Sequence, residues 1–310
     1  MPEGDSLVRV ANRLRPVLAG RELRRTDFRV PQLATADLSG RTVEAVWPRA
    51  KYLVVQAGEL AVLSHLKMEG HWDVHELTGP DGAPLRPRWR SPGWQARCVL
   101  ETAEHQVVGF QLGLLEVLPT AGLEERLGFL GPDLLDPGWA DPAVAAALLE
   151  EGVRRLAAEP ERPIGVALLD QRLVSGIGNI YRCETLLLAG LDPHRPVSAV
   201  PDLPGLVLLA RDLMRVNTGP GPRGTTDVVR DDAAPYGIRV RTPPGGPGGP
   251  YANRPAAGAR GGADRRAPRY WVYGRGRHGC YRCGGPVAVE QLGDARALDR
   301  TLHWCPRCQR

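Results

Sequence analysis

Two pairs of closely spaced cysteines near the end of the sequence constrain this chain more than any other feature. Cys280 and Cys283 form one Cys-x-x-Cys motif, Cys305 and Cys308 form a second, and 21 residues separate the two motifs. Four thiolates in this spacing are typical of a closed tetrahedral zinc site. Two disulfides or a chance arrangement are the alternatives. We expect one structural Zn²⁺ ion per chain, in a compact module over residues 269–310.

The expected compartment favours a metal site over disulfide bonds for these four cysteines. The start of the sequence has no signal-peptide pattern, and no apolar run approaches the ~18 residues of a membrane span. We therefore expect a cytoplasmic protein with no membrane partner, in which disulfides are rare. The chain has 40 Lys and Arg against 35 Asp and Glu, a formal net charge of +5. This mildly basic balance favours an anionic partner without proving one.

Changes in periodicity divide the chain into four segments and predict an α+β fold. Residues 1–120 begin with a predicted helix over Asp5–Pro16, and short β-type runs between glycine and proline turns then indicate a β-sandwich. Residues 121–218 have helical spacing. The helices predicted there span Leu123–Leu130, Pro142–Val153, Pro163–Leu169, Asn179–Ala189 and Pro201–Val216. Residues 219–268 are rich in Gly, Pro and Arg, which predicts a disordered insertion before the cysteine module.

The first residues, Met1-Pro2-Glu3-Gly4-Asp5, suggest a nucleophile. Removal of Met1 would leave Pro2 with a terminal secondary amine, and roughly a tenth of such an amine is neutral at pH 7. A secondary amine that attacks a sugar C1′ forms a covalent iminium intermediate. Glu3 could move protons to and from the leaving base. The alternative is an ordinary solvated N-terminus.

Three further stretches could contact an anionic ligand. Gly176-Ile177-Gly178-Asn179 is a glycine turn that opens a helix, whose first N–H groups favour an anion; a plain helix hairpin is the alternative. Lys51 opens an apolar strand, or is a surface lysine. Met68, within His65–Gly70, is either a core residue or a wedge for the hole that a flipped base leaves. Cys98 and Cys183 have no partner at ligand spacing and are interpreted as buried thiols.

Five segments together resemble the Fpg/Nei family of DNA glycosylases. They are the PEGD opening, the AKYL segment at 50–53, the HLKMEG loop at 65–70, the DQRLVSGIGNIYRCE segment at 170–184 and the WVYGR…CYRC…CPRCQ tail. They follow the family's order and cover nearly the whole chain apart from the insertion. The PEGD opening resembles the endonuclease VIII branch, and the HLKMEG loop and the long match around GIGN resemble its actinobacterial form. The resemblance implies a β-sandwich, a helix–two-turn–helix domain and a zinc-finger hairpin, with DNA bound between the halves.

The resemblance also implies residue roles. Pro2 would be the nucleophile and Glu3 the proton donor. Lys51 would lie at the reaction centre, Met68 would be the wedge, and Asn179 and Arg300 would grip phosphates. Base loss followed by β- and δ-elimination would then cut the strand.

The function implied is excision of oxidised pyrimidines from damaged DNA by a monomeric, nucleoid-associated repair enzyme. An Fpg-like enzyme for oxidised purines and a zinc-ribbon DNA-binding protein with vestigial catalysis are the alternatives.

The gap between the cysteine motifs and the length of the insertion before Tyr270 depart from the family pattern. The gap of 21 residues between the cysteine motifs is longer than usual, and Glu290–Leu298 is interpreted as an extra loop. Fpg enzymes read the base opposite the lesion with an Arg-Phe pair. The corresponding segment, His105–Leu118, contains Phe110 but no arginine.

Overall fold

The computed structural model describes residues 2–241, 268–295 and 297–310 of the chain. It divides into two compact units, Met1–Phe129 and Leu130–Arg310, which are considered separately below.

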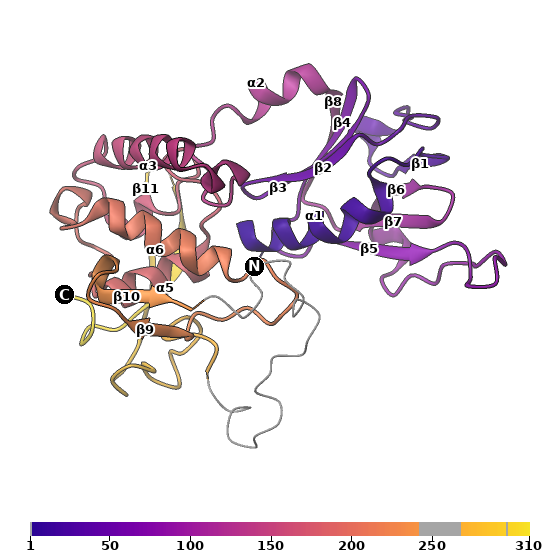
Figure 1. Ribbon diagram of the computed structural model, residues 1–310. Coiled ribbons are helices and arrows are strands. Elements are labelled where there is room, and N and C mark those ends of the chain that lie inside the picture. Colours follow the sequence, from indigo (N-terminus) through magenta and orange to yellow (C-terminus); the bar gives the residue numbers. More distant parts are fainter. Residues whose placement is uncertain (1, 242–267, 296) are drawn as a thin grey trace. The chain divides into compact units, whose positions relative to one another are not determined.

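The first unit is a sandwich of two antiparallel four-stranded sheets (Figure 1). One sheet has the strand order β1-β6-β7-β5 and the other β2-β3-β4-β8. The strands of the first sheet are β1 (Arg25–Phe28), β6 (Ala96–Glu101), β7 (His105–Phe110) and β5 (His71–Glu76). Those of the second are β2 (Ala45–Arg49), β3 (Tyr52–Ala57), β4 (Leu60–His65) and β8 (Leu114–Pro119). Apolar side chains of both sheets form one buried core, as the sequence pattern predicts.

A single long helix, α1 (Gly4–Leu18), covers the edges of both sheets. Its buried residues Leu7, Ala11, Leu14 and Leu18 recur at helical spacing and join the sandwich core. Hydrogen bonds reach from α1 to both edge strands: its arginine side chains donate to Val46 O of β2 and to Trp72 O of β5. Figure 1 shows α1 between these two strands. The helix therefore protects the exposed edges and is itself held firmly in place.

A short helix, α2 (Leu123–Leu127), ends the first unit, and helices dominate the second. The second unit's helices are α3 (Pro142–Ala157), α4 (Ile164–Ala167), α5 (Asn179–Ala189) and α6 (Leu203–Arg215). Asp141 caps α3 by accepting hydrogen bonds from two backbone N–H groups of its first turn, with Pro142 at the first helical position, as the sequence predicts. A hairpin of β11 (Ala288–Asp294) and β12 (Ala297–Trp304) carries the cysteine module.

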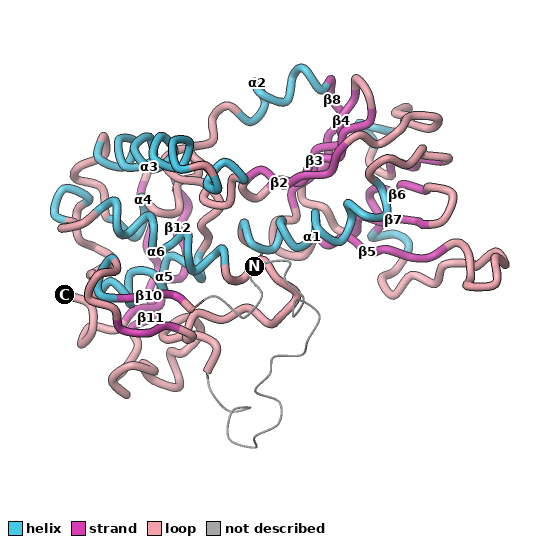
Figure 2. The backbone as a smooth tube through the Cα atoms, viewed as in Figure 1, coloured by secondary structure: helices cyan, strands magenta, loops and turns pink. Residues whose placement is uncertain are grey.

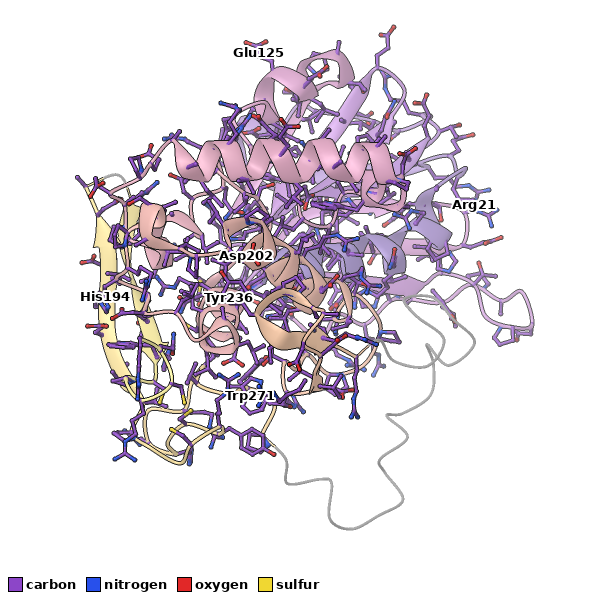
Figure 3. All side chains as sticks on the ribbon, turned by 60° about the vertical axis from the view of Figure 1, so that its left-hand side comes forward. Arg21, Glu125, His194, Asp202, Tyr236 and Trp271 are labelled. Atoms are coloured by element: carbon purple, nitrogen blue, oxygen red, sulfur yellow. The ribbon has the colours of Figure 1, made fainter. Side chains whose placement is uncertain are left out.

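Part of the segment predicted to be disordered is structured. Strands β9 (Val228–Arg230) and β10 (Ile238–Val240), which Figure 1 labels and Figure 2 draws among the magenta strands, form an antiparallel pair, so the prediction is wrong for residues 228–240. The reason is long-range packing, because apolar residues of this hairpin join the core of the second unit. Tyr236, which Figure 3 labels near Asp202, donates its hydroxyl hydrogen bond to Asp202 O over 2.6 Å. Burial raises the pKa of Tyr236 to about 12. Residues 242–267 lie outside the described residues, where disorder stays a prediction.

The predicted extra loop at Glu290–Leu298 is also wrong. Residues 290–294 and 297–298 lie in the two strands of the hairpin, with a register shift between Leu292 and Asp294. Asp294 accepts a hydrogen bond from the buried Arg162 side chain at 2.6 Å, and Arg162 also donates to Asp170 at 2.8 Å. Burial alone would lower the pKa of Arg162, but the two carboxylates together raise it. The longer hairpin is thus fixed to the helical core by ion pairs between the buried Arg162 and two partly exposed carboxylates.

Candidate active site and metal centre

Three turns of the sandwich lie at one end of the second sheet. The pairing of Arg49 with Tyr52, of Tyr52 with His65 and of His65 with Leu114 places the β2–β3, β4–β5 and β7–β8 connections together. Gly113 N donates to His65 O over 3.0 Å, which joins the last two connections directly. We call these three connections the turn cluster.

Helix α1 points its first residues toward the turn cluster. Gly20 N, just past the end of α1, donates to Val43 O, and Arg15 Nε donates to Val46 O at 3.1 Å. The helix therefore runs antiparallel to β2, so its first turn lies toward the end of β2 at Arg49. Pro2 and Glu3, which directly precede α1, are carried to the same end.

Glu3 is the N-cap residue of α1 and is completely buried. Its backbone is fixed from both sides, because Ser6 N donates to Glu3 O at 2.9 Å and Glu3 N donates to Ser6 Oγ at 3.4 Å. Pro2 is half-buried. A rigid helix start thus holds Pro2 and Glu3 in a defined position.

Lys51 lies in the two-residue turn between β2 and β3, next to Ala50, which has a positive φ of 52°. Burial first, and then the positive charges of Lys67 and Lys51, lower the pKa of His65 to about 4. His65 is therefore neutral at physiological pH, and its Nδ1 accepts a hydrogen bond from Lys67 N over 2.9 Å. The turn cluster concentrates positive charge around a neutral imidazole.

Met68 is exposed at the tip of the β4–β5 turn, with 59% of its surface accessible. The core alternative for this residue is therefore wrong. The turn closes through a hydrogen bond from Gly70 N to Leu66 O at 2.9 Å. A Cβ on Gly70 would lie 2.5 Å from Leu66 O, so this tight turn requires glycine. The backbone holds Met68 outward in a defined place.

The β7–β8 connection contains a residue that the sequence analysis missed. Gln111 has a positive φ of 47°, and its Nε2 donates to Glu69 Oε2 over 3.2 Å, next to Met68. Phe110, in contrast, is completely buried and packs on His71 and Trp89, with ring centroids 5.2 and 5.5 Å away. Phe110 is thus a core residue, and Gln111 is the polar side chain beside Met68.

In the second unit, Asn179 and Arg300 come together through a buried arginine. Asn179 Nδ2 donates to Thr301 O at 2.7 Å, and Asn179 Oδ1 accepts from Arg182 Nη2 at 2.5 Å. Arg182 Nη2 also donates to Arg300 O at 3.3 Å. The Arg300 side chain itself is exposed on β12. The first turn of α5 and the middle of β12 thus form one hydrogen-bonded surface.

Gln171 organises the glycine turn before α5. It lies in the DQRLVSGIGNIYRCE segment, and no role was predicted for it. Gln171 Nε2 donates to Ile177 O at 3.0 Å, and Gly176 N donates to Gln171 Oε1 at 3.0 Å. Gly176 has a positive φ of 97°, which glycine adopts without strain. The Gln171 side chain therefore hydrogen-bonds to the backbone on both sides of the turn and holds that backbone in one conformation.

Two charged residues of α5 have structural roles that were not predicted. Arg182 and Glu184 are both completely buried in the helix. Glu184 accepts backbone hydrogen bonds of 2.7 to 2.9 Å from Trp271, Val272 and Tyr273, and also one from the Thr225 hydroxyl. Burial raises the pKa of Glu184, whereas these donors oppose the shift. The only signal in the sequence is two charges inside an otherwise apolar helix.

The four predicted metal ligands lie in one cluster. The sulfur atoms of Cys280, Cys283, Cys305 and Cys308 are all within 4.8 Å of one another. The Cys280–Cys308 and Cys283–Cys305 sulfur separations are 4.0 and 3.6 Å. Sulfurs around a tetrahedral Zn²⁺ with Zn–S bonds of about 2.3 Å are ~3.8 Å apart, so the cluster fits such an ion. Cys98 and Cys183 are buried, as predicted, and neither belongs to the group of four sulfurs.

Family comparisons agree with this arrangement. Residues 1–111 match the formamidopyrimidine-DNA glycosylase N-terminal domain, and residues 139–216 match the formamidopyrimidine-DNA glycosylase H2TH domain. A probable endonuclease 8 2 of Streptomyces coelicolor is 40% identical over 313 residues, covering 100% of this chain and 94% of that protein. This chain belongs to the Fpg/Nei family of DNA glycosylases. The endonuclease VIII branch is the one the opening residues predict.

Other Fpg/Nei proteins support the branch and the fold. The DNA-(apurinic or apyrimidinic site) lyase Nei2 of Mycolicibacterium smegmatis is 36% identical, covering 100% of this chain and 99% of that protein. A solved complex of a Lactococcus lactis Fpg mutant with tetrahydrofuran-containing DNA has a TM-score of 0.66 at 21% identity, covering 100% of both chains. The predicted fold class is confirmed.

This Fpg/Nei chain is accordingly a DNA glycosylase and DNA-(apurinic or apyrimidinic site) lyase of base-excision repair. Within the described ranges, no helix combines the length and apolar character needed to cross a membrane.

Proposed function

We propose that this enzyme excises oxidised pyrimidines from damaged DNA and then cuts the strand through a Schiff base at Pro2. The observation that best supports the pyrimidine assignment is the β7–β8 connection, Gln111-Leu112-Gly113, which contains no arginine. The full-length identity to endonuclease 8 proteins, 36–40%, supports the same branch. Formamidopyrimidine-DNA glycosylases such as that of Methylobacterium nodulans reach 33% over 75% of this chain.

The reaction begins with the Pro2 amine, which removal of Met1 would expose. Its lone pair forms a bond to C1′ of the damaged nucleotide, and the bond between C1′ and the base breaks. Glu3 supplies a proton to the leaving base. The Pro2 nitrogen then gives up its proton, the C1′–O4′ bond opens as O4′ takes a proton, and an iminium joins Pro2 to the sugar. The position of both groups at the rigid start of α1 supports this assignment.

Strand cleavage follows from the iminium. It acidifies the C2′ proton, whose loss expels the 3′ phosphate by β-elimination, and a second elimination expels the 5′ phosphate. Lys51, in the turn cluster, supplies a fixed positive charge near the reacting sugar and phosphates. The low pKa of His65, about 4, leaves the imidazole neutral there, so it does not add to that charge at pH 7.

DNA is the partner that these residues would hold. We assign Met68 as the wedge that fills the space of the flipped nucleotide, because it is exposed on a tight, glycine-dependent turn. We assign Arg300 and the first turn of α5 at Asn179 to the flanking phosphates. An arginine side chain and a helix N-terminus are both suited to phosphate.

We further propose that the four-cysteine cluster holds Zn²⁺, which has a structural role because four thiolates leave no position for substrate. Replacing Cys305 with Ser should remove the metal and disorder the hairpin that carries Arg300. We expect metal content to fall from one zinc per chain to near zero and DNA affinity to fall about tenfold or more. The first unit should stay folded, because the cysteines lie wholly in the second.

The measurements are metal analysis and DNA binding by fluorescence anisotropy, with Cys98→Ser as the matched control outside the cluster. Active wild-type protein without zinc would contradict the assignment.

The substrate assignment is tested by the base opposite the lesion. Without a guanidinium in the β7–β8 connection, one bidentate contact to the opposite base is missing, and such contacts provide ~1–3 kcal/mol of discrimination. We expect the rate of excision to vary less than about tenfold with the opposite base, which corresponds to under ~1.4 kcal/mol. Single-turnover excision of 5-hydroxyuracil, dihydrouracil and 8-oxoguanine, each opposite all four bases, measures this.

Introducing an arginine tests the same point within this chain. The Gln111→Arg variant should gain discrimination between opposite bases, and Gln95→Arg provides a control on a neighbouring backbone position. Rapid, cytosine-dependent excision of 8-oxoguanine by the wild type, with slow release of the pyrimidine lesions, would instead support an oxidised-purine enzyme. Binding without excision of any lesion would support a DNA-binding protein with vestigial catalysis.

A further inference from the structure

The connection between β5 and β6 combines arginine with tryptophan. From Gly82 to Leu100 the sequence has arginine at positions 86, 88, 90 and 97 and no acidic residue. The side chains of Arg86, Arg88 and Arg90 are exposed. We call residues 85–94 the Arg-Trp strap. A run of arginines with no acidic residue among them in the sequence favours an extended, anionic partner.

The two tryptophans of the Arg-Trp strap have different surroundings. Trp89 is fixed, because its indole N–H donates to Gln106 Oε1 at 2.6 Å and the guanidinium of Arg29 lies 5.1 Å from its ring centroid. Trp94 is 72% exposed, more than any other large apolar side chain in the described part of the chain. Trp89 therefore anchors the strap, whereas folding does not require the indole of Trp94.

The backbone around Trp94 is nevertheless held in place. Arg97 Nη1 donates to Trp94 O at 2.8 Å, and Gln95 N donates to Pro92 O at 2.9 Å. Ser91 Oγ and His71 Nε2 are hydrogen-bonded at 3.1 Å. An aromatic ring on a fixed backbone loses little conformational entropy when it binds a ligand.

Trp94 also lies close to the turn cluster. Gln95 O accepts a hydrogen bond from Gln111 N at 2.9 Å, and Gln111 Nε2 donates to Glu69 Oε2 at 3.2 Å. Trp94 and Met68 are the sequence neighbours of Gln95 and Glu69. The two most exposed large apolar residues of the first unit, Trp94 and Met68, therefore lie at the same end of the sandwich.

We propose that Trp94 stacks on an unpaired base of single-stranded DNA beside the lesion, while the arginines of the Arg-Trp strap contact the phosphates of that strand. This proposal rests on the proposed function, because it takes Met68 to face DNA. Aromatic rings interleaved with arginine bind single strands in this way, since every base offers a flat π face. The exposed arginines at positions 86, 88 and 90 accompany Trp94 in the strap, and their positive charge favours a polyanion over an apolar protein partner.

The test compares DNA forms that carry the same tetrahydrofuran abasic analogue, which the lyase cannot cut. Binding is measured by fluorescence anisotropy to single-stranded, bubble and fully paired DNA. We expect Trp94→Ala to weaken binding to the single-stranded and bubble forms about tenfold and to change duplex binding less than about threefold. Trp94→Phe should keep most of the affinity, because a phenyl ring still stacks. Leu85→Ala, an exposed apolar residue of the same strap, should bind as the wild type does.

The arginines are tested through salt dependence. For single-stranded DNA, each lost phosphate contact should reduce the slope of log affinity against log salt by about 0.7. For Arg88→Gln combined with Arg90→Gln, which removes two contacts, we expect a reduction of about 1.4. Arg21→Gln combined with Arg24→Gln provides a charge-matched control, since both arginines are exposed on the same unit (Figure 3 labels Arg21).

Equal losses on all DNA forms, or no loss for Trp94→Ala, would overturn the proposal, as would an effect that Trp94→Phe does not restore. Borohydride trapping on paired abasic DNA tests the Pro2 mechanism of the proposed function separately from the role of Trp94. Absent trapping in the wild type would remove the Pro2 mechanism and leave the stacking result standing. Normal trapping with unchanged single-strand binding would remove only the role of Trp94.

Discussion

Blocking the amine of Pro2 is expected to abolish covalent trapping of abasic-site DNA. Acetylation of the terminal nitrogen converts the nucleophilic amine to an amide that cannot form an iminium. Borohydride reduction of the wild-type complex should place the DNA link on Pro2 by peptide mass mapping. Affinity for uncut tetrahydrofuran DNA should change little, because the blocked protein keeps the turn cluster and the hairpin.

The composition of the chain makes this test unusually clean. Lys51 and Lys67 are its only two lysines. Three amines at most can therefore form a Schiff base, and the Lys51→Arg and Lys67→Arg variants serve as matched controls. Pro2→Gly keeps a primary amine and should retain part of the lyase activity. Full trapping with a blocked terminus, lost on replacing either lysine, would contradict the Pro2 assignment.

Glu3→Gln is expected to separate the two activities. The substitution keeps the shape of a buried side chain but removes its exchangeable carboxyl proton, and general acid–base catalysis contributes typically 10²–10⁴-fold. Base excision should therefore fall about 10²-fold or more. Cleavage of a preformed abasic site should fall less than about tenfold, since no base remains to be protonated.

The measurement is single-turnover kinetics on a lesion substrate and on an abasic substrate of the same sequence. Glu22→Gln, an exposed carboxylate of the same unit, is the control. Thermal unfolding of both variants shows whether the sandwich is intact. Equal losses on the two substrates would show that Glu3 acts on the shared sugar chemistry or on binding.

Local sequence signals predicted the features that depend on near neighbours. The spacing of Leu7, Leu14 and Leu18 predicted the apolar face of α1, and Asp141-Pro142 predicted the start of α3. The cysteine spacing predicted the cluster of four sulfurs. Each of these depends on periodicity or on capping chemistry within a few residues, which a single sequence displays directly.

Features that depend on distant residues were missed. Strands β9 and β10 are three residues long each, and packing against the helical core stabilises them. Arg182 and Glu184 are buried because β12 and Trp271–Tyr273, which follow far along the chain, supply their partners. Phe110 is a core residue because His71 and Trp89 pack on it. No local pattern contains these pairings.

The hydrogen bonds of Glu184 allow the length of the chain between Thr225 and Trp271 to vary. Glu184 binds Thr225 on one side and Trp271–Tyr273 on the other, while Thr225 N donates to Arg269 O at 2.9 Å. Thr225 and the Trp271–Tyr273 segment, which lie far apart along the chain, are thus tied together by contacts of their own. Each doubling of a flexible loop's length costs only ~0.6 kcal/mol. Relatives could gain or lose residues here, and a fluorophore or affinity tag could be inserted, at small expense to the finger that follows.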